Sequence, residues 1–318
     1  MTPTQLRTFA AIARHGSSRR AASELGVSEA AVSSNVAALR KELGDELFHR
    51  SGSGLTFTPG GLRLAARAVE MLGLQDQTVH EIRAASEGQR VLRIAVSSLF
   101  GETSAPGLVE LFSSRADDLQ VEVSEWNPDQ FVRLLTARAV DVAFGPASKA
   151  LPDSIRSTEF LRYQLVAVVG AQHPVAGLKT SPAAMAAQTW LLGPSAVDPS
   201  SSASRMLRHF RVPEEHQRIF PNHAAALIDA RSGHGVALCP GHAAVAELSD
   251  GRLVRVDVPG AMADGVWATF ALRHDLGNPL TNEIIRFAST PRAIQAMLTG
   301  SGANIARFKP RVHVTLWS

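Results

Sequence analysis

The sequence contains one cysteine and no long hydrophobic run. Cys239 alone excludes an internal disulfide and any metal site built from several cysteines, which agrees with a reducing compartment. No window approaches the roughly 18 consecutive apolar residues of a membrane span. Residues 1–16 have helical periodicity without the apolar region or cleavage site of a signal peptide. We therefore expect a cytoplasmic protein that does not enter the membrane.

Motifs for cofactor and metal chemistry are also scarce. The sequence has neither a GxxxxGK motif nor a GxGxxG motif after a strand. His234, Cys239 and His242 have a spacing that could suit a metal, but Cys239 ends an apolar segment, so core packing is the better interpretation. Little around Cys239 would activate it as a nucleophile. We predict no metal, no cofactor and no enzyme activity.

The chain carries a small excess of positive charge, and this charge is unevenly distributed along the sequence. The 318 residues are 45% apolar and 19% charged, which predicts a globular protein of two or three domains. Residues 1–67 hold nine Arg and Lys against five acids, a net +4, whereas the whole chain is +3 and the other 251 residues therefore sum to −1. This asymmetry favours a polyanionic partner for the N-terminal part.

The N-terminal segment is predicted to form three short helices and a hairpin. Leu6, Phe9 and Ile12 mark a first helix ending near Gly16. Ser18 is expected to cap a second helix over residues 19–25, and Ser28 to cap a third. The connection through Gly26 and Val27 makes a helix-turn-helix, and residues 47–50 and 55–57 around the turn 51–54 make a wing.

The third helix has a small, polar outer face. Val32, Val36, Leu39 and Leu43 form its buried stripe, and the opposite side carries short side chains that allow close approach to a major groove. The first turn and this face are expected to read bases, while the arginines and the histidine of the second helix and wing meet phosphates. The predicted DNA-binding residues are Arg19, Ser28, Glu29, Ala30, Ser33, Ser34, Asn35, His49 and Arg50.

These residues resemble the winged helix of LysR-type transcriptional regulators. The similar positions span about forty residues: Ser18, Arg20, Ala21, Ala22, Leu25, Ser28, Ala31, Val32, Ser33, Val36, Leu39, Leu43, Gly44, Leu47, Phe48, Arg50, Leu55, Thr56 and Gly60. Arg40 stands where the family usually has Glu, and Glu29, Ala30 and Ser34 also depart from its pattern. The resemblance implies binding to an inverted-repeat operator in double-stranded DNA.

A long helix is predicted after the wing. Thr58 and Pro59 form a helix start, and helical composition continues to Glu87, giving a rod of about 45 Å. A near-heptad stripe follows Leu62, Ala65, Val69, Leu72, Val79 and Ile82. The helix could pack on its own domain or pair with a second copy. We favour pairing into a homodimer, and the family resemblance implies a homotetramer.

From Val91 onward strands and helices alternate, which predicts a two-lobed α/β domain. This region resembles periplasmic binding proteins and the effector domain of the family. The fold expected is therefore α/β, with a mostly α winged helix-turn-helix (1–58), a linker helix (59–88) and an effector-binding domain (89–300). Lobe I comprises 91–162 and 266–298, and lobe II 163–265. The extension 301–318 could be an added strand or disordered.

The expected strands are residues 91–96, 119–123, 140–144, 165–169, 190–192, 218–220, 235–238 and 266–272. The expected helices are 106–114, 128–137, 183–187, 201–210, 223–231 and 279–298, the last broken at Pro291.

Ligands of open parallel sheets bind beyond the carboxyl ends of strands, where helix N-termini offer N–H groups. This rule selects Ser97, Ser98, Gly145, Pro146, Pro194, Ser195, Asn222 and His223 as effector-binding residues. Hydroxyls and N–H donors suit a small anionic metabolite. Ser97 and Ser195 could instead be simple helix caps, which is the commoner role of serine.

Two functions remain open from the sequence. One is a DNA-binding transcriptional regulator controlled by an effector between the lobes. The alternative is a solute-binding protein or enzyme of the periplasmic-binding fold, whose N-terminal helices serve only assembly. The ordered winged-helix pattern and the missing signal peptide favour the regulator.

Overall fold

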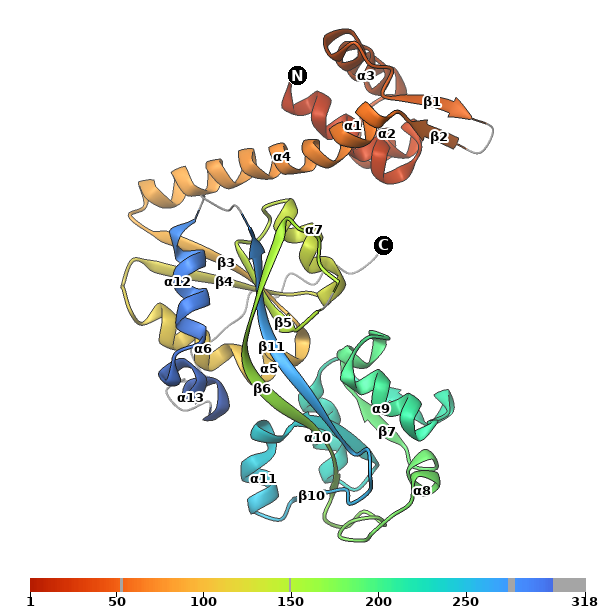
Figure 1. The fold of residues 1–318 in the computed structure, drawn as a ribbon, viewed down its shortest axis with the longest axis vertical. Coiled ribbons are helices and arrows are strands. Elements are labelled where there is room, and N and C mark those ends of the chain that lie inside the picture. Colours follow the sequence, from red (N-terminus) through yellow and green to blue (C-terminus); the bar gives the residue numbers. More distant parts are fainter. Residues whose placement is uncertain (52–53, 149, 274–277, 300–318) are drawn as a thin grey trace. The chain divides into compact units, whose positions relative to one another are not determined.

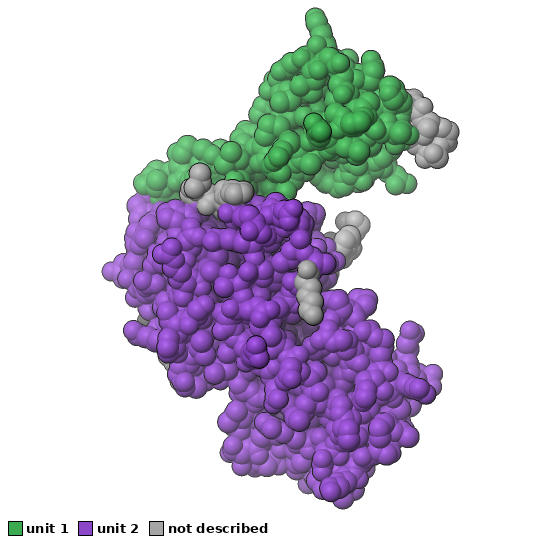
Figure 2. Space-filling model, viewed as in Figure 1, with its two compact units in different colours: residues 1–87, 136–139 green, residues 88–135, 140–318 purple. Residues whose placement is uncertain are grey.

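The computed structural model describes residues 1–51, 54–148, 150–273 and 278–299, with the side chains of residues 50, 51 and 54 left out. The predicted extension 301–318 lies outside the described residues. The chain divides into two compact units, residues 1–87 with 136–139 and residues 88–135 with 140–318 (Figure 2). Within the part described, no helix combines the length and apolarity needed to span a membrane.

Three capped helices begin the first unit: α1 (Pro3–His15), α2 (Ser18–Leu25) and α3 (Glu29–Leu43). The α2 cap was predicted one residue too late, because Ser17 and not Ser18 accepts the N–H of Arg20. Ser28 caps α3 as expected. Each helix ends at a glycine with positive φ, at Gly16, Gly26 and Gly44, where a side chain would strain the backbone.

The core of this winged helix forms where α1, α3 and the wing meet. The wing pairs β1 (Phe48–Ser51) with β2 (Gly54–Phe57) in antiparallel register. Phe9, Phe48 and Phe57 pack as an aromatic cluster with ring centroids 5.7–6.3 Å apart. Val32, Val36 and Leu39 are buried as predicted, but Leu43 is 42% exposed, because α3 ends there and passes beyond the core.

The linker helix α4 (Pro59–Ser86) packs on its own domain along its first half. Gly61, Leu64 and Ala68 are buried there, and Ala65, Val69 and Leu72 pack against the same core from partly buried positions. Of the predicted stripe, Ala65, Val69 and Leu72 therefore pack partly on the winged-helix core, whereas Leu62 is exposed.

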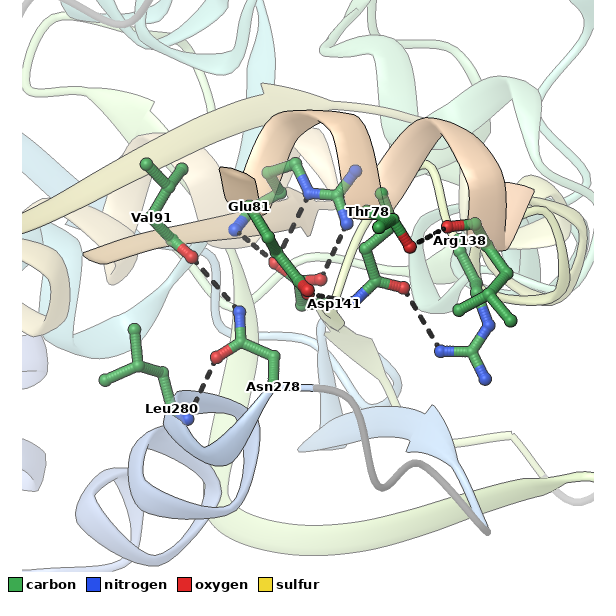
Figure 3. Close-up of polar contacts among 10 residues, drawn as sticks. Thr78, Glu81, Val91, Arg138, Asp141, Asn278 and Leu280 are labelled. Atoms are coloured by element: carbon green, nitrogen blue, oxygen red, sulfur yellow. Dashed lines mark hydrogen bonds and ion pairs between the residues drawn. The ribbon is translucent and has the colours of Figure 1, made fainter. Parts of the chain in front are cut away.

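The second half of α4 packs on residues 136–139, which belong to the same unit. A side chain at Gly73 would meet the carbonyl oxygen of Ala137, so only glycine allows this approach. Buried Gln77 accepts from Arg138 at 3.1 Å and donates to Glu81 at 2.7 Å (Figure 3). From Met71 onward, four large apolar side chains of α4 are exposed: Met71, Leu74, Val79 and Ile82.

The second unit contains one mixed sheet, in which the described residues form nine strands in the order β4-β3-β5-β11-β6-β9-β7-β8, with β10 beside β6. Lobe I holds the parallel strands β3 (Arg90–Val96), β4 (Leu119–Glu125) and β5 (Val142–Pro146). Lobe II holds the parallel strands β7 (Trp190–Leu192), β8 (Gln217–Ile219) and β9 (Val236–Pro240). The parallel βαβ arrangement predicted for both lobes is confirmed.

Two long strands run through both lobes (Figure 1). β6 (Ile155–Gly170) pairs antiparallel with β11 (Met262–Leu272), and β10 (Leu253–Arg255) pairs with β6. The sequence predicted only residues 165–169 of β6, because charged residues interrupt its first half, and it missed β10. Since both strands continue from one lobe to the other, a change in one lobe can reach the next through shared backbone.

Helices cover the strands of both lobes. Lobe I has α5 (Ser98–Thr103), α6 (Ala105–Ser113), the 3₁₀ turn η1 (Pro128–Gln130), α7 (Phe131–Thr136), α12 (Pro279–Ala288) and α13 (Pro291–Thr299). Lobe II has α8 (Pro182–Ala186), η2 (Pro194–Val197), α9 (Ser202–Phe210), η3 (Glu214–His216), α10 (His223–Arg231), η4 (Gly241–Ala244) and α11 (Val245–Ser249). The helix α5 was not predicted, and it carries a residue of the site below.

The core of the second unit is aromatic in lobe I. Phe100, Phe144 and Trp267 are fully buried, and Tyr163 stacks on Trp267 with centroids 4.2 Å apart. Asp141, only 4% exposed, binds the Arg93 side chain at 2.8 Å and its backbone N–H at 2.8 Å (Figure 3). Full burial of a large apolar side chain contributes about 1.5–3 kcal/mol, so this core fixes the strand ends from which the site is built.

Candidate DNA-binding surface and effector site

The outer face of α3 begins with its cap. Ser28 accepts the N–H of Ala31 at 3.2 Å, and Glu29 and Ala30 in the following turn are exposed. One turn later Ser33 and Ser34 are exposed as well. This face therefore presents three serine hydroxyls, one alanine and one carboxylate, which permits close approach of a nucleic acid backbone.

Asn35 does not belong to this exposed face. Its Nδ2 donates to Oγ1 of Thr8 at 2.9 Å, and Thr8 in α1 is 2% exposed. The half-buried amide thus joins α3 to α1. The placement of Asn35 beside Ser33 and Ser34 in the sequence analysis is wrong, because a small polar residue at a boundary position was assigned to solvent.

Arg19 and Glu29 form an ion pair between α2 and α3. Nε of Arg19 lies 3.1 Å from Oε1 of Glu29, with the side chains 85% and 55% exposed. Exposed pairs of this kind contribute about 0–1 kcal/mol. The pair offsets the carboxylate that would otherwise face phosphates, and leaves the other guanidinium nitrogens of Arg19 able to donate.

The wing is fixed to α3 by Arg40. Its guanidinium donates to the carbonyls of Glu46 and Phe48, both at 2.7 Å, and lies 4.9 Å from the centre of the Phe48 ring. His49, next in β1, is exposed, and the side chain of Arg50 lies outside the described residues. The arginine that departs from the winged-helix pattern therefore has a positioning role at the base of the wing.

In lobe I, the predicted effector residues lie at two neighbouring strand ends. Ser97 follows β3 and precedes α5, but its side chain makes no capping bond, and its buried Oγ has no partner among the described residues. Ser98 begins α5, and Gly145 and Pro146 end β5. A side chain on Gly145 would meet the ring of Phe131 at 2.7 Å and Cβ of Ser97 at 3.5 Å, so glycine allows these elements to converge.

In lobe II, Ser195 and His223 are in direct contact. Oγ of Ser195 lies 2.8 Å from Nε2 of His223, which is 7% exposed. Pro194 begins the 3₁₀ turn that carries Ser195, and Asn222 caps α10 by accepting the N–H of Ala225. A side chain at Gly193 would lie 2.3 Å from the His223 ring, so the ring packs directly on this glycine. Ser195 lies inside η2 and is not a helix cap, because the cap position of η2 is Gly193.

Glu102 in α5 connects the lobe I residues of the site to the lobe II residues. It was not among the residues predicted from the sequence. Its carboxylate accepts the N–H groups of His223 and Ala224, each at 2.9 Å, and lies 2.8 Å from Nδ1 of His223. Burial raises the pKa of Glu102, but the hydrogen bonds and charge of His223 outweigh it, so the pKa is lowered overall. The carboxylate is ionised and crosses from lobe I to lobe II.

Two descriptions of known protein families match the chain. Residues 3–62 match the family described as bacterial regulatory helix-turn-helix protein, lysR family, and residues 85–290 match the LysR substrate binding domain. The chain belongs to the LysR family. It is a LysR-family transcriptional regulator with an N-terminal helix-turn-helix and an effector-binding domain, as predicted.

Relatives that are named as regulators cover most or all of the chain. The HTH-type transcriptional regulator MT0391 of Mycobacterium tuberculosis (strain CDC 1551 / Oshkosh) is 51% identical over 321 residues, covering all of both chains. The RuBisCO operon transcriptional regulator of Allochromatium vinosum is 30% identical, covering 80% of this chain and 85% of its own. The crystal structure of ArgP from Mycobacterium tuberculosis is 22% identical with a TM-score of 0.58, covering 90% of this chain and 97% of that one, and it supports the fold.

Three further polar side chains of this LysR-family regulator are relevant to the interlobe contact. Oγ of Ser104 in lobe I is 3.4 Å from Nε2 of His242 in lobe II, and burial lowers the pKa of His242. At the end of β4, burial and the charge of Glu102 raise the pKa of Glu125. These three side chains come from three separate segments of the chain.

His234, Cys239 and His242, whose spacing could suit a metal, have structural roles in the regulator. Cys239 is buried in β9, and burial raises the pKa of its thiol to about 12. Nδ1 of His234 lies 2.6 Å from Asp229, while His242 faces Ser104. The structure, over the ranges it describes, brings no three such side chains together as metal ligands. Core packing of Cys239 is confirmed.

A separate cavity of about 560 Å³ lies in lobe II, lined by Ala171, Gln172, Arg231, Gly251 and Arg252. No strand end selected by the sequence lines it. Its two arginines already have acidic partners, Glu247 at 3.0 Å from Arg231 and Asp250 at 2.9 Å from Arg252. The interlobe residues therefore remain the better candidates for an effector.

Proposed function

We propose that this regulator binds an inverted-repeat operator as a homodimer, assembling further into a homotetramer, and responds to a small anionic metabolite held between its two lobes. The observation that carries the DNA-binding part is the outer face of α3, where Ser33 and Ser34 are exposed on a helix anchored by a capped first turn. Short hydroxyl side chains can hydrogen-bond base edges in the major groove.

The contacts divide into two kinds. Ser28, Glu29, Ala30, Ser33 and Ser34 are proposed to face the bases, while Arg19, His49 and Arg50 hold the sugar–phosphate backbone. Base-edge contacts determine sequence preference, and phosphate contacts supply affinity without it. Asn35 supports this surface from behind through Thr8.

Pairing is proposed through the second half of α4. Met71, Leu74, Val79 and Ile82 are exposed there, and at 100° per residue they share one side of the helix. Gln77 and Gly73 occupy the other side, where they pack within their own unit. A second copy is the proposed occupant of the apolar side, because two such stripes can cover each other in an isologous contact.

The effector is proposed to lie among Ser97, Ser98, Gly145, Pro146, Pro194, Ser195, Asn222 and His223. Two observations support this: the buried hydroxyl of Ser97 lacks a partner among the described residues, and the start of α10 already accommodates a carboxylate. Helix N-termini favour negative charge by about 0.3–1 kcal/mol. A metabolite with an acid group fits this chemistry.

The order Ser195, His223, Glu102 matches the hydroxyl–imidazole–carboxylate sequence of hydrolases. We nevertheless propose no enzyme activity, because Glu102 also binds two backbone N–H groups and so serves the contact between lobes. No metal or cofactor is needed for the proposed role. Because the proposed regulator binds chromosomal DNA, we propose that it acts in the cytoplasm.

The experiment is a footprint of the purified full chain on the DNA upstream of its own gene and its neighbours. The proposal expects protection of two half-sites related by inverted repeat, with one helical turn or a multiple between their centres. It also expects that one metabolite of a panel of carboxylates and phosphates changes the footprint. Protection no better than on random DNA at physiological salt rejects the DNA-binding part.

A further inference from the structure

The start of α10 has no vacant donors for an effector in this structure. The N–H groups of its first three residues all have acceptors: those of His223 and Ala224 bind Glu102, and that of Ala225 binds the Asn222 cap. The His223 ring is occupied on both sides, by Glu102 at Nδ1 and by Ser195 at Nε2. The groups suited to an acid are thus already used by an acid of the same chain.

Glu102 is well placed for this role. It lies in lobe I, on a helix that begins directly after the effector residue Ser97, and its side chain is 21% exposed. Its two oxygens divide between the donors as a ligand carboxylate would: Oε1 accepts from His223 and Oε2 from Ala224. Ionised acceptors strengthen such bonds roughly twofold over neutral ones.

We propose that Glu102 is a tethered substitute for the acid group of the effector, and that an effector acts by replacing it at the start of α10. This inference rests on the proposed function, since it concerns the same interlobe site. Glu102 thereby decides which effectors can act: only an acid that competes successfully with a carboxylate of the same chain releases α5 from α10.

Competition sets a threshold for the effector. A group tethered by a short segment has an effective concentration in the millimolar range. A simple monocarboxylate with weak affinity cannot displace Glu102, whereas an acid with further contacts can. The buried hydroxyl of Ser97, without a partner among the described residues, is one group available for such a contact once α5 moves.

Replacement also explains how binding would change the protein. The bonds of Glu102 join lobe I to lobe II, so their loss removes a restraint between lobes. A ligand shifts a conformational equilibrium only by its difference in affinity for the two states. Here the difference is explicit, because the effector binds α10 only where Glu102 does not.

The test is rescue of Glu102→Ala by acetate. This variant vacates the carboxylate position while the full chain keeps its other effector residues. Calorimetry and thermal unfolding are measured with sodium acetate and with sodium chloride at equal ionic strength. We expect acetate to bind E102A at millimolar concentration, raise its Tm and return its footprint toward wild type, with at least tenfold weaker binding to the wild-type protein.

Glu125→Ala is the matched control. It removes a nearby carboxylate whose pKa responds to Glu102, but it leaves the N–H groups of α10 bound to Glu102. Acetate should have no specific effect on E125A. Equal responses of E102A, E125A and wild type, or no acetate binding to E102A, overturn the inference. If E102A does not fold, Glu102→Gln is used with sulfate as the probe, and binding no tighter than to wild type overturns it.

The two proposals fail separately. Acetate rescue of E102A supports the tethered carboxylate even if no metabolite in the panel changes the wild-type footprint, which is the result that counts against the proposed effector. A metabolite that changes the wild-type footprint but binds E102A no more tightly contradicts the role of Glu102 and leaves the effector proposal intact.

Discussion

The carboxylate of Glu102 binds both the ring and the backbone of His223, with Oε1 2.8 Å from Nδ1 and 2.9 Å from the backbone nitrogen. Glu102 lies in lobe I and His223 in lobe II. Because the ionised carboxylate can only accept, Nδ1 carries a proton toward Glu102, and Nε2 lies 2.8 Å from Oγ of Ser195. One carboxylate therefore fixes the imidazole and joins the lobes.

This contact predicts how stability depends on pH. The pKa of Glu102 is lowered in the folded protein, so its contribution is fully present above the unfolded pKa and is lost as the pH falls through the folded pKa. The groups that face it are His223 and Glu125. Relative to wild type, Glu102→Gln should lower the Tm at pH 7, and the difference should shrink below about pH 4. A constant difference across this range contradicts the assignment.

Glu125 should behave in the opposite way. Burial and the charge of Glu102 raise its pKa, so its ionised form destabilises the folded state at neutral pH, and stability is gained as the pH falls through the raised value. Glu125→Gln should therefore raise the Tm at pH 7 and lose this advantage in acid. Thermal unfolding of both glutamine variants in one buffer series compares the two signs directly.

On the DNA surface, Ser33 and Asn35 should have separable effects. Ser33→Ala should change preference at a particular base, by about 1–3 kcal/mol for a good contact. Asn35→Ala removes the bond to Thr8 and should lower the free energy of unfolding by about 1 kcal/mol while leaving base preference intact. Binding of both variants to sets of single-base operator changes, alongside chemical denaturation, distinguishes the roles.

Arg50→Ala provides the comparison for phosphate contacts. It should weaken binding to specific and random DNA alike and reduce the salt dependence, measured as the slope of log K against log salt, by about one. If Arg50→Ala and Ser33→Ala produce the same loss on both kinds of DNA, the division between base and backbone contacts is incorrect.

Pairing through α4 predicts a difference between two faces of one helix. Ile82→Asp places a charge on the exposed apolar side and should lower both the oligomer order and the affinity for the operator. His80→Asp, about 200° away around the helix, is the matched control and should change neither. Light scattering measures the order. A wild-type monomer that binds its operator at full strength rules out the pairing.

Sequence reasoning succeeded where the signals were local. The strand Trp190–Leu192 and the helix His223–Arg231 have the predicted bounds, because a short apolar segment and an asparagine cap mark them within a few residues. Pro291 was expected to break a helix, and it begins α13. The winged helix was likewise recovered from caps, glycines and periodicity, apart from one cap.

Sequence reasoning failed where the partner is distant. Asn35 looks like a surface residue until Thr8, 27 positions earlier, is placed beside it. Glu102 lies on a six-residue helix too short to show periodicity, and its partner follows 121 positions later. Val69 packs partly on the winged-helix core, and heptad spacing alone does not reveal this contact. Each error concerns a tertiary contact that no local pattern encodes.

The central claim is that α3 reads an operator and that the interlobe site alters how the regulator holds this operator. Quantitative footprinting of wild type, Ser33→Ala and Glu102→Ala on DNA upstream of the gene tests it most directly. The account predicts two protected half-sites for wild type, altered base preference for S33A, and for E102A a changed protection pattern with unchanged base preference. Identical footprints for all three proteins, or protection that no base change affects, would contradict it.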